Sequence, residues 1–246
     1  MVRAESAEGI ARIALDRPEK KNAFTAEMYR SLGAALAAAD RAAEVRAVLL
    51  HGTRECFSAG NDLADFLKPR ASGEESPAAH LFRTLPAMQK PVVAAVAGPA
   101  IGIGCTLLLH CDLVYAGQGA RFQLPFVPLG LVPEFGSTYL LPLLAGYQRA
   151  TELLLLGQPF TAEKARDAGL VNAIVPDADV LATAEKAARA LAALPPESIR
   201  LTKALLRKTH AAALEARIAE EAGIFAERLA SPEAKAAMSA FLEKRK

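Results

Sequence analysis

The stretch Pro91-Val-Val-Ala-Ala-Val-Ala-Gly-Pro-Ala-Ile-Gly-Ile-Gly104 sets the fold class of this chain. Its short apolar run ends at a glycine, which predicts a strand over residues 91–98 that is buried on both faces. Gly102 and Gly104 then form a turn that leads into an apolar helix at residues 106–110. Glycine lets the backbone approach a ligand closely, and the first N–H groups of a helix are free donors. The turn is therefore either a binding site or an ordinary glycine turn that ends a strand.

The segments before this stretch repeat the pattern of strand, turn and helix. Residues 9–15 and 47–52 are short apolar segments that predict strands. Residues 26–40 carry apolar side chains at helical spacing behind Thr25, a residue type that caps helices. A further helix is expected at about residues 78–88. Strands that alternate with helices predict an α/β fold with at least some parallel pairing.

From about residue 178 the pattern changes to helices alone. Alanine-rich amphipathic segments are interrupted at Pro195-Pro196 and at Ser231-Pro232. Because an apolar helix face needs a partner, these helices are expected to pack on the core or on another subunit. We therefore divide the chain into a core of residues 1–194 and a helical region of residues 195–246 that caps the core or mediates oligomerisation.

The composition is that of a globular protein with a small net charge. Of the 246 residues, 52% are hydrophobic and 23% charged, and 29 basic against 27 acidic residues leave a net charge of +2. This balance of charge disfavours nucleic acid as a partner. No run of about 18 apolar residues occurs, so no membrane span is predicted. Three cysteines without C-x-x-C spacing are typical of reduced thiols. A soluble, cytoplasmic protein is expected.

Glu134 is the candidate catalytic side chain. It is the only charged residue between Arg121 and Arg149, in a stretch rich in apolar side chains, proline and glycine. A carboxylate in such a setting loses water, which raises its pKa and suits it to general base catalysis near neutral pH. The alternative is an acid in the first turn of a helix after Pro133, where the helix dipole favours it.

A second glycine turn, Phe57-Ser-Ala-Gly-Asn-Asp-Leu63, follows the strand predicted at residues 47–52. Two such turns can together form an oxyanion hole. Competing motifs fail: residues 98–104 do not spell G-x-G-x-x-G, and neither a P-loop nor a G-x-S-x-G elbow occurs. His110-Cys111-Asp112 contains metal-ligand types, but consecutive side chains point in different directions. A packed histidine is favoured there, and no metal is expected.

Five segments in order resemble the crotonase (enoyl-CoA hydratase/isomerase) superfamily, namely residues 15–24, 57–63, 91–104, 111–116 and 161–171. The resemblance implies a spiral of ββα turns with a C-terminal helical subdomain. It implies a homotrimer or hexamer that acts on acyl-CoA thioesters, in which CoA enters as part of the substrate and no separate cofactor is needed.

The same resemblance assigns roles to individual residues. The backbone N–H groups of Asn61 and Ile103 correspond to the oxyanion hole. The two glutamates that hydratases use align with Thr106 and Phe126, so both carboxylates are missing. Glu134 falls instead where Δ3,Δ2-enoyl-CoA isomerases keep one glutamate, which takes a proton from C2 and returns it at C4.

Contacts with CoA are also carried over by resemblance. Lys203 is expected either near the phosphates or in solvent. Alternatives remain open: enoyl-CoA hydratase-like or other thioester chemistry that uses Glu134 or Asp62, and a non-catalytic acyl-CoA- or RNA-binding relative. The residues expected along the CoA moiety are Lys20, Ala23, Phe24, Ala59, Gly60, Asp62, Leu63 and Gly104.

Overall fold

A computed structural model describes residues 1–66 and 75–243. Its larger sheet has six strands in the order β1-β2-β3-β4-β6-β9. β1 pairs antiparallel with β2, and every later pair in this sheet is parallel. The sequence pattern predicted β2, β3 and β4 from their apolar runs. The strands are β1 (Val2–Ala7), β2 (Ile10–Leu15), β3 (Ala47–His51), β4 (Val92–Val96), β6 (Leu113–Gly117) and β9 (Ala173–Val175).

A smaller sheet lies beyond the carboxyl ends of these strands. It contains β5 (Pro99–Ile101), β7 (Arg121–Gln123) and β8 (Phe160–Thr161), with β5 parallel to β7. Two single bridges, Phe24 with Asn61 and Ser58 with Ala100, extend the same layer to earlier turns of the chain. Each turn thus runs from the large sheet to the small layer and then into a helix. This is the predicted ββα spiral.

The strand predicted at residues 91–98 is shorter than expected, because the chain changes direction at Gly98. Gly98 has φ +62°, and a Cβ there would lie 1.9 Å from the Glu55 carbonyl oxygen. The backbone therefore leaves β4 and starts β5 in the second sheet. The helix predicted at residues 106–110 is also different: a short α4 (Ile103–Thr106) tightens into the 3₁₀ turn η2 (Leu107–His110).

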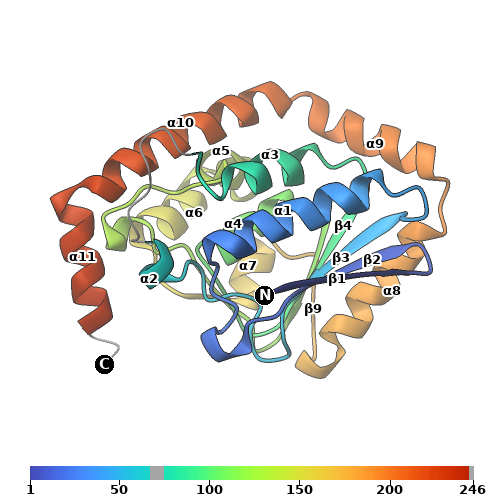
Figure 1. Ribbon diagram of the computed structural model, residues 1–246, viewed down its shortest axis with the longest axis horizontal. Helices are drawn as coiled ribbons and strands as arrows, with labels where there is room; N and C mark the ends of the chain where they lie inside the picture. Colours follow the sequence, from blue (N-terminus) through green and yellow to red (C-terminus); the bar gives the residue numbers. More distant parts are fainter. Residues whose placement is uncertain (67–74, 244–246) are drawn as a thin grey trace.

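Helices cover both faces of the large sheet (Figure 1). The Thr25 side chain accepts the Met28 N–H and caps α1, as predicted. α1 packs against α3, and α8 packs on β3 and β4 on the opposite face. These helices and the shorter ones are α1 (Ala26–Arg41), α2 (Leu63–Phe66), α3 (Ala79–Ala87), α5 (Ser137–Ala145), α6 (Tyr147–Thr151), α7 (Ala162–Asp167), α8 (Val180–Ala192), η1 (Pro18–Lys20), η3 (Val127–Leu129), η4 (Glu152–Leu156, π-helical) and η5 (Asp177–Asp179).

The C-terminal helices α9 (Pro196–Lys208), α10 (Ala211–Ala230) and α11 (Pro232–Glu243) form an arch over the helical face (Figure 1). α10 contacts α5, and α11 contacts η3. The expectation that this tail packs on the core is therefore confirmed for α10 and α11. The division at residue 194 and a role in oligomerisation stay predictions.

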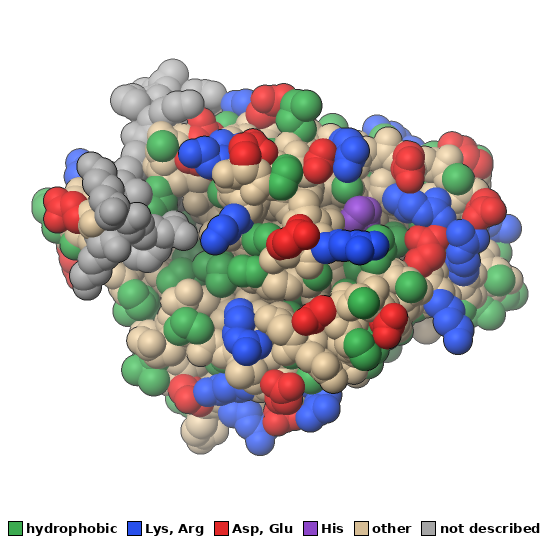
Figure 2. All heavy atoms as spheres, turned by 90° about the horizontal axis from the view of Figure 1, so that it is seen from below, with side chains coloured by type: hydrophobic (Ala, Val, Ile, Leu, Met, Phe, Trp, Pro, Cys, Tyr) green, Lys and Arg blue, Asp and Glu red, His purple; other side chains and the backbone are tan. Residues whose placement is uncertain are grey.

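The surface carries charges of both signs, interspersed over the face in Figure 2. Cys56, Cys105 and Cys111 are free thiols, as expected. Within the described ranges, no helix is both long and apolar enough to cross a membrane.

Candidate active site

The two glycine turns lie side by side, because they belong to successive turns of the spiral. Ser58 N–H donates to the Pro99 carbonyl and Ile101 N–H to the Ser58 carbonyl, both at 2.9 Å. A Cβ on Gly60 would lie 3.0 Å from the Ile101 carbonyl oxygen, and one on Gly104 would lie 2.8 Å from the Ser58 Cβ. The glycines thus allow the two turns to meet.

The N–H groups of Asn61 and Ile103 are unengaged at this junction. Gly60 N–H donates to Ser58 Oγ and Asp62 N–H to the Phe24 carbonyl, whereas the Asn61 N–H between them has no partner in residues 1–66 and 75–243. The Ile103 N–H opens α4 and likewise has no partner in those ranges. Two free donors at adjoining turns can stabilise an oxygen that gains negative charge. Their catalytic use stays a prediction.

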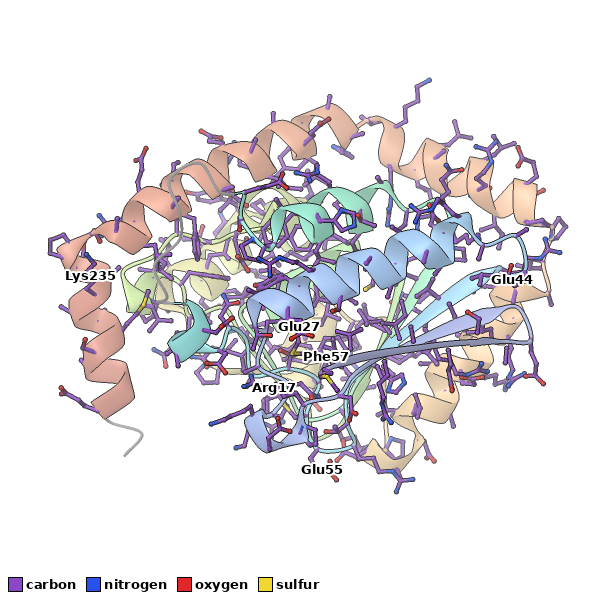
Figure 3. All side chains as sticks on the ribbon, viewed as in Figure 1. Arg17, Glu27, Glu44, Glu55, Phe57 and Lys235 are labelled. Atoms are coloured by element: carbon purple, nitrogen blue, oxygen red, sulfur yellow. The ribbon has the colours of Figure 1, made fainter. Side chains whose placement is uncertain are left out.

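Asn22 holds the first turn in place, a role the sequence pattern did not reveal. Its side chain is fully buried, and its Nδ2 donates to the Cys56 carbonyl at 2.8 Å. The Ser58 hydroxyl donates back to the Asn22 carbonyl at 2.9 Å. Asn22 has φ +54°, a left-handed conformation that asparagine tolerates better than most residues. Figure 3 labels two neighbours of this region, Arg17 and Phe57, below the N-terminal end of α1.

Glu134 lies on a sharply bent turn before α5. Phe135 and Gly136 both adopt left-handed backbone conformations, with φ of +59° and +72°. The Phe135 ring is stacked between Phe82 and His110, with centroid separations of 4.1 and 3.9 Å. Because α5 begins only at Ser137, Glu134 precedes the first helical turn. The helix-start interpretation of Glu134 is therefore wrong.

The Glu134 carboxyl group is buried without a compensating partner. The residue is 6% exposed, and its Oε1 atom has no hydrogen-bond partner among the described residues. Burial, and secondarily the negative charge of Glu221, raises the pKa of Glu134 to about 8. Such a carboxyl group can exchange a proton near neutral pH.

Glu134 faces a cavity of about 800 Å³. Phe24 also lines it, and the Phe24 N–H donates to the Gly60 carbonyl at 2.7 Å, which joins the cavity wall to the first glycine turn. Lys20 is exposed at the end of η1, and Ala23 is buried. Contacts of these residues with CoA stay predictions. The cavity wall is mainly apolar and comes from α1, α3, α5 and α10, including Tyr29, Phe82, Leu140, Leu214, Ile218 and Phe225.

Asp62 is engaged elsewhere and is a poor candidate base. Its Oδ2 pairs with Arg17 at 2.8 Å, and its Oδ1 accepts the Ala64 N–H at 3.1 Å. Partial burial alone would raise the Asp62 pKa, but Arg17 and the N–H groups of Asp65 and Ala64 outweigh it and lower that pKa. The alternative in which Asp62 exchanges protons with a substrate is disfavoured.

The expectation for Lys203 is wrong on both counts, because it is neither in solvent nor free to bind phosphate. Its Nζ is buried and donates to Asp112 Oδ2 and to the Lys90 carbonyl, each at 2.6 Å. Arg207 binds the other Asp112 oxygen at 3.0 Å. Burial lowers the Lys203 pKa, and Asp112 opposes that shift. Asp112 is 91 residues away in the chain, so no local sequence signal revealed the pair.

Thr106 and Phe126, which the resemblance places where hydratases have glutamates, are not acidic. Thr106 is buried with its hydroxyl directed at the Ile103 carbonyl, and Phe126 packs edge-on against Phe225.

His110 is a packed histidine, as predicted: its Nε2 lies 2.8 Å from the Phe135 carbonyl. Cys111 points to the Leu107 carbonyl, and Asp112 pairs with Lys203 and Arg207 of α9. Residues 1–66 and 75–243 contain no cluster of three His, Cys, Asp or Glu side chains suited to a metal ion.

Comparisons with known proteins identify the family. A family model described as enoyl-CoA hydratase/isomerase matches residues 5–246. The chain is 37% identical to enoyl-CoA delta isomerase 2 of Homo sapiens over 98% of its own length, but it spans only 62% of that relative. It is 36% identical to 1,2-epoxyphenylacetyl-CoA isomerase of Escherichia coli (strain K12), covering 96% of this chain and 93% of the relative. Further relatives, at 35% and 33% identity, carry hydratase names.

A solved enoyl-CoA hydratase/isomerase from Pseudoalteromonas atlantica T6c has the same fold. It superposes with a TM-score of 0.95 at 39% identity, covering 100% of this chain and 98% of that structure. The likeness extends over both the spiral and the C-terminal arch. The chain therefore belongs to the enoyl-CoA hydratase/isomerase family and has the crotonase fold.

Proposed function

We propose that this chain is a Δ3,Δ2-enoyl-CoA isomerase in which Glu134 is the acid and base. The observation that carries the proposal is the Glu134 carboxyl group, buried in the wall of an apolar cavity with one oxygen unpartnered and a pKa raised to about 8. One carboxyl group suffices for this reaction, because the proton that it removes is the proton that it returns.

In the proposed reaction the Glu134 carboxylate removes a proton from C2 of a 3-enoyl thioester. The electron pair moves through the 3,4 double bond and the carbonyl to give a dienolate, whose oxygen accepts hydrogen bonds from Asn61 N–H and Ile103 N–H. Glu134 then donates the proton to C4, which leaves the double bond between C2 and C3. Loss of one oxyanion donor typically costs about 10²–10³ in rate.

Hydration is disfavoured because water addition needs groups that position and activate water. The two places where hydratases hold those carboxylates are occupied by Thr106 and Phe126. Similarity to a relative named enoyl-CoA delta isomerase 2 supports the isomerase, although that relative is longer than this chain. A cytoplasmic location, which the free thiols favour, and assembly as a trimer or hexamer belong to the same proposal.

The test is to offer the protein a 3-enoyl-CoA and, separately, crotonyl-CoA. We expect conjugation of the first, seen as an increase in ultraviolet absorbance, and slow hydration of the second. Glu134→Gln should lower isomerisation by about 10²–10⁴-fold while acyl-CoA binding is retained. Rapid hydration of crotonyl-CoA, or full turnover by Glu134→Gln, would contradict the proposal.

A further inference from the structure

Glu221 of α10 is a second buried carboxyl group beside the Glu134 turn. It is 4% exposed, and its Oε2 accepts the Gly136 N–H at 2.5 Å. Its Oε1 accepts the Thr138 N–H at 2.9 Å and the Thr138 hydroxyl at 2.5 Å. The first N–H groups of a helix have no partner within the helix. Glu221 therefore caps α5 from a helix more than 80 residues away in the chain.

The two carboxyl groups have opposite surroundings. Three donors point at Glu221 and favour its charged form, whereas Glu134 Oε1 has no donor in the part of the chain the structure describes. Two nearby buried carboxyl groups resist ionising together, so over a range of pH the pair holds one proton. The donors decide where that proton resides, because they stabilise the anion on Glu221.

We propose that Glu221 is a positioning residue for Glu134: it fixes the turn that carries Glu134, and by remaining charged it makes Glu134 the member of the pair that gains and loses the proton. This inference rests on the proposed function, in which Glu134 exchanges a proton with the substrate. It assigns different roles to two carboxyl groups through their surroundings, one to transfer the proton and one to remain charged.

The neighbouring charges are compatible with this division. Burial raises the Glu221 pKa, and the Thr138 and Gly136 donors, with Arg217 one turn before Glu221 on α10, oppose that rise. Arg217 also donates to Thr138 Oγ1 at 3.3 Å. Burial lowers the pKa of His110 to about 4, so this ring is neutral where the pair titrates. Arg207 is bound to Asp112 and to two backbone carbonyls. Among the described residues, the remaining titratable groups in the cavity wall are Tyr29 of α1, Asp65 of α2, Arg83 of α3, and His210 and Glu215 at α10.

The decisive measurement is a carboxyl titration of the whole protein by infrared or ¹³C NMR spectroscopy. We expect a carboxyl group that titrates near pH 8 in the wild type and is absent in Glu134→Gln. In Glu221→Gln the midpoint should fall by about one pH unit or more, because a charged neighbour has been removed. Glu220→Gln is the matched control: Glu220 is exposed and pairs with Arg217, and this variant should leave the midpoint in place.

Two outcomes overturn the inference: an unchanged midpoint in Glu221→Gln, or a titration near pH 8 that disappears in Glu221→Gln and persists in Glu134→Gln. This readout does not need turnover. If Glu134→Gln retained isomerisation while the titrations behaved as expected, the proposed function would fail and the pairing would stand.

Variants that keep the Glu221 charge test its role in placing the turn. Glu221→Asp retracts the carboxylate by one methylene, so kcat should fall at least tenfold while the acid limb of the pH profile stays near its wild-type position. Thr138→Val removes the hydroxyl donor and should lower kcat with little change in KM, and Thr138→Ser should restore it. Wild-type kcat in both Glu221→Asp and Thr138→Val would overturn the positioning role, even where Glu221→Gln does not fold.

Discussion

Burial of Glu134 opposes stability while it favours chemistry. The folded state holds the carboxyl proton more tightly than the unfolded chain does, because the Glu134 pKa rises from 4.5 to about 8 on folding. The stability that the proton on Glu134 contributes is therefore fully present below about pH 4.5 and is lost as the pH rises through about 8. The charged, catalytically competent form is thus the less stable one.

Glu134→Gln should therefore stabilise the protein at alkaline pH. A neutral amide of similar size does not have to lose a proton in a dry site. Between pH 6 and pH 9, we expect the free energy of unfolding of the wild type to fall by roughly 3 kcal/mol more than that of the variant. Urea unfolding at the two pH values measures the difference. Equal losses in both proteins would show that Glu134 is not buried as a charged group.

The Asn61 side chain should be dispensable for catalysis. Its Oδ1 accepts the Tyr29 hydroxyl at 2.7 Å, so the amide group holds Asn61 against α1, whereas the proposed oxyanion donor is its backbone N–H. Asn61→Ala keeps that N–H and should reduce kcat by less than about tenfold, well below the loss of a whole donor. Steady-state kinetics of Asn61→Ala and Tyr29→Phe test this, and complete loss of turnover in Asn61→Ala would make the amide side chain catalytic.

At the scale of elements, the contact between the two turns depends on Gly104. A side chain there would press on the Ser58 Cβ and carbonyl oxygen, at 2.8 and 3.0 Å, and would separate the donors. Gly104→Val should lower kcat by about 10²-fold or more, with a smaller effect on unfolding of about 1–3 kcal/mol. Gly223→Ala is the control, because a Cβ at Gly223 meets nothing within 4 Å. Wild-type kcat in Gly104→Val would exclude the paired-turn account.

The buried ion pair between Lys203 of α9 and Asp112 should stabilise the fold without contributing to acyl-CoA binding. Lys203→Met removes the cation from Asp112 and leaves Arg207 as its remaining basic partner. We expect the free energy of unfolding to fall by about 3 kcal/mol, since breaking a buried pair is costly. KM for acyl-CoA should be unchanged, because Lys203 does not reach solvent. Lys208→Met, at an exposed position on the same helix, should change neither quantity.

Local sequence signals predicted several of the helices and strands but not the contacts between them. The apolar runs of β3 and β4, the Thr25 cap and the isolated acid Glu134 were all predictable, because each depends on near neighbours in the chain. Glu221 was not, since Glu220-Glu221 on an amphipathic helix has the pattern of a solvated pair of charges. The three groups that donate hydrogen bonds to Glu221 lie at the start of α5 and in the turn before it. These segments come close to α10 only when the chain folds.

In the whole molecule, the cavity is lined by segments that are far apart in the sequence. α1 and α3 form one side, and α10 of the C-terminal arch forms the other (Figure 1). The arch therefore supplies part of the site as well as covering the core. This explains why the proposed catalytic residue and the residue that positions it belong to separate regions of the sequence.

Large apolar side chains are exposed in a single chain, both on the arch and on α6 and η4. Leu205 of α9 is 69% exposed, Tyr147 of α6 is 72% exposed, and Leu155 and Leu156 of η4 are also exposed. Leu201 and Leu205, one turn apart on α9, are both exposed, and an apolar helix face needs a partner. We therefore predict a homotrimer or a pair of trimers, in which copies of this chain cover these side chains.

Sedimentation at micromolar concentration tests the assembly, with three or six chains expected and a monomer contradicting it. Leu205→Glu should shift the distribution toward monomer, because a charge buried at an interface without a partner is strongly unfavourable. Lys208→Glu, which changes charge at an exposed polar position of the same helix, should leave the assembly intact. If Leu205→Glu also assembles fully, the interface lies elsewhere, and the exposed leucines of η4 become the next positions to substitute. Because α9 continues into the helix that carries Glu221, loss of assembly should also lower kcat if neighbouring chains hold the arch over the cavity.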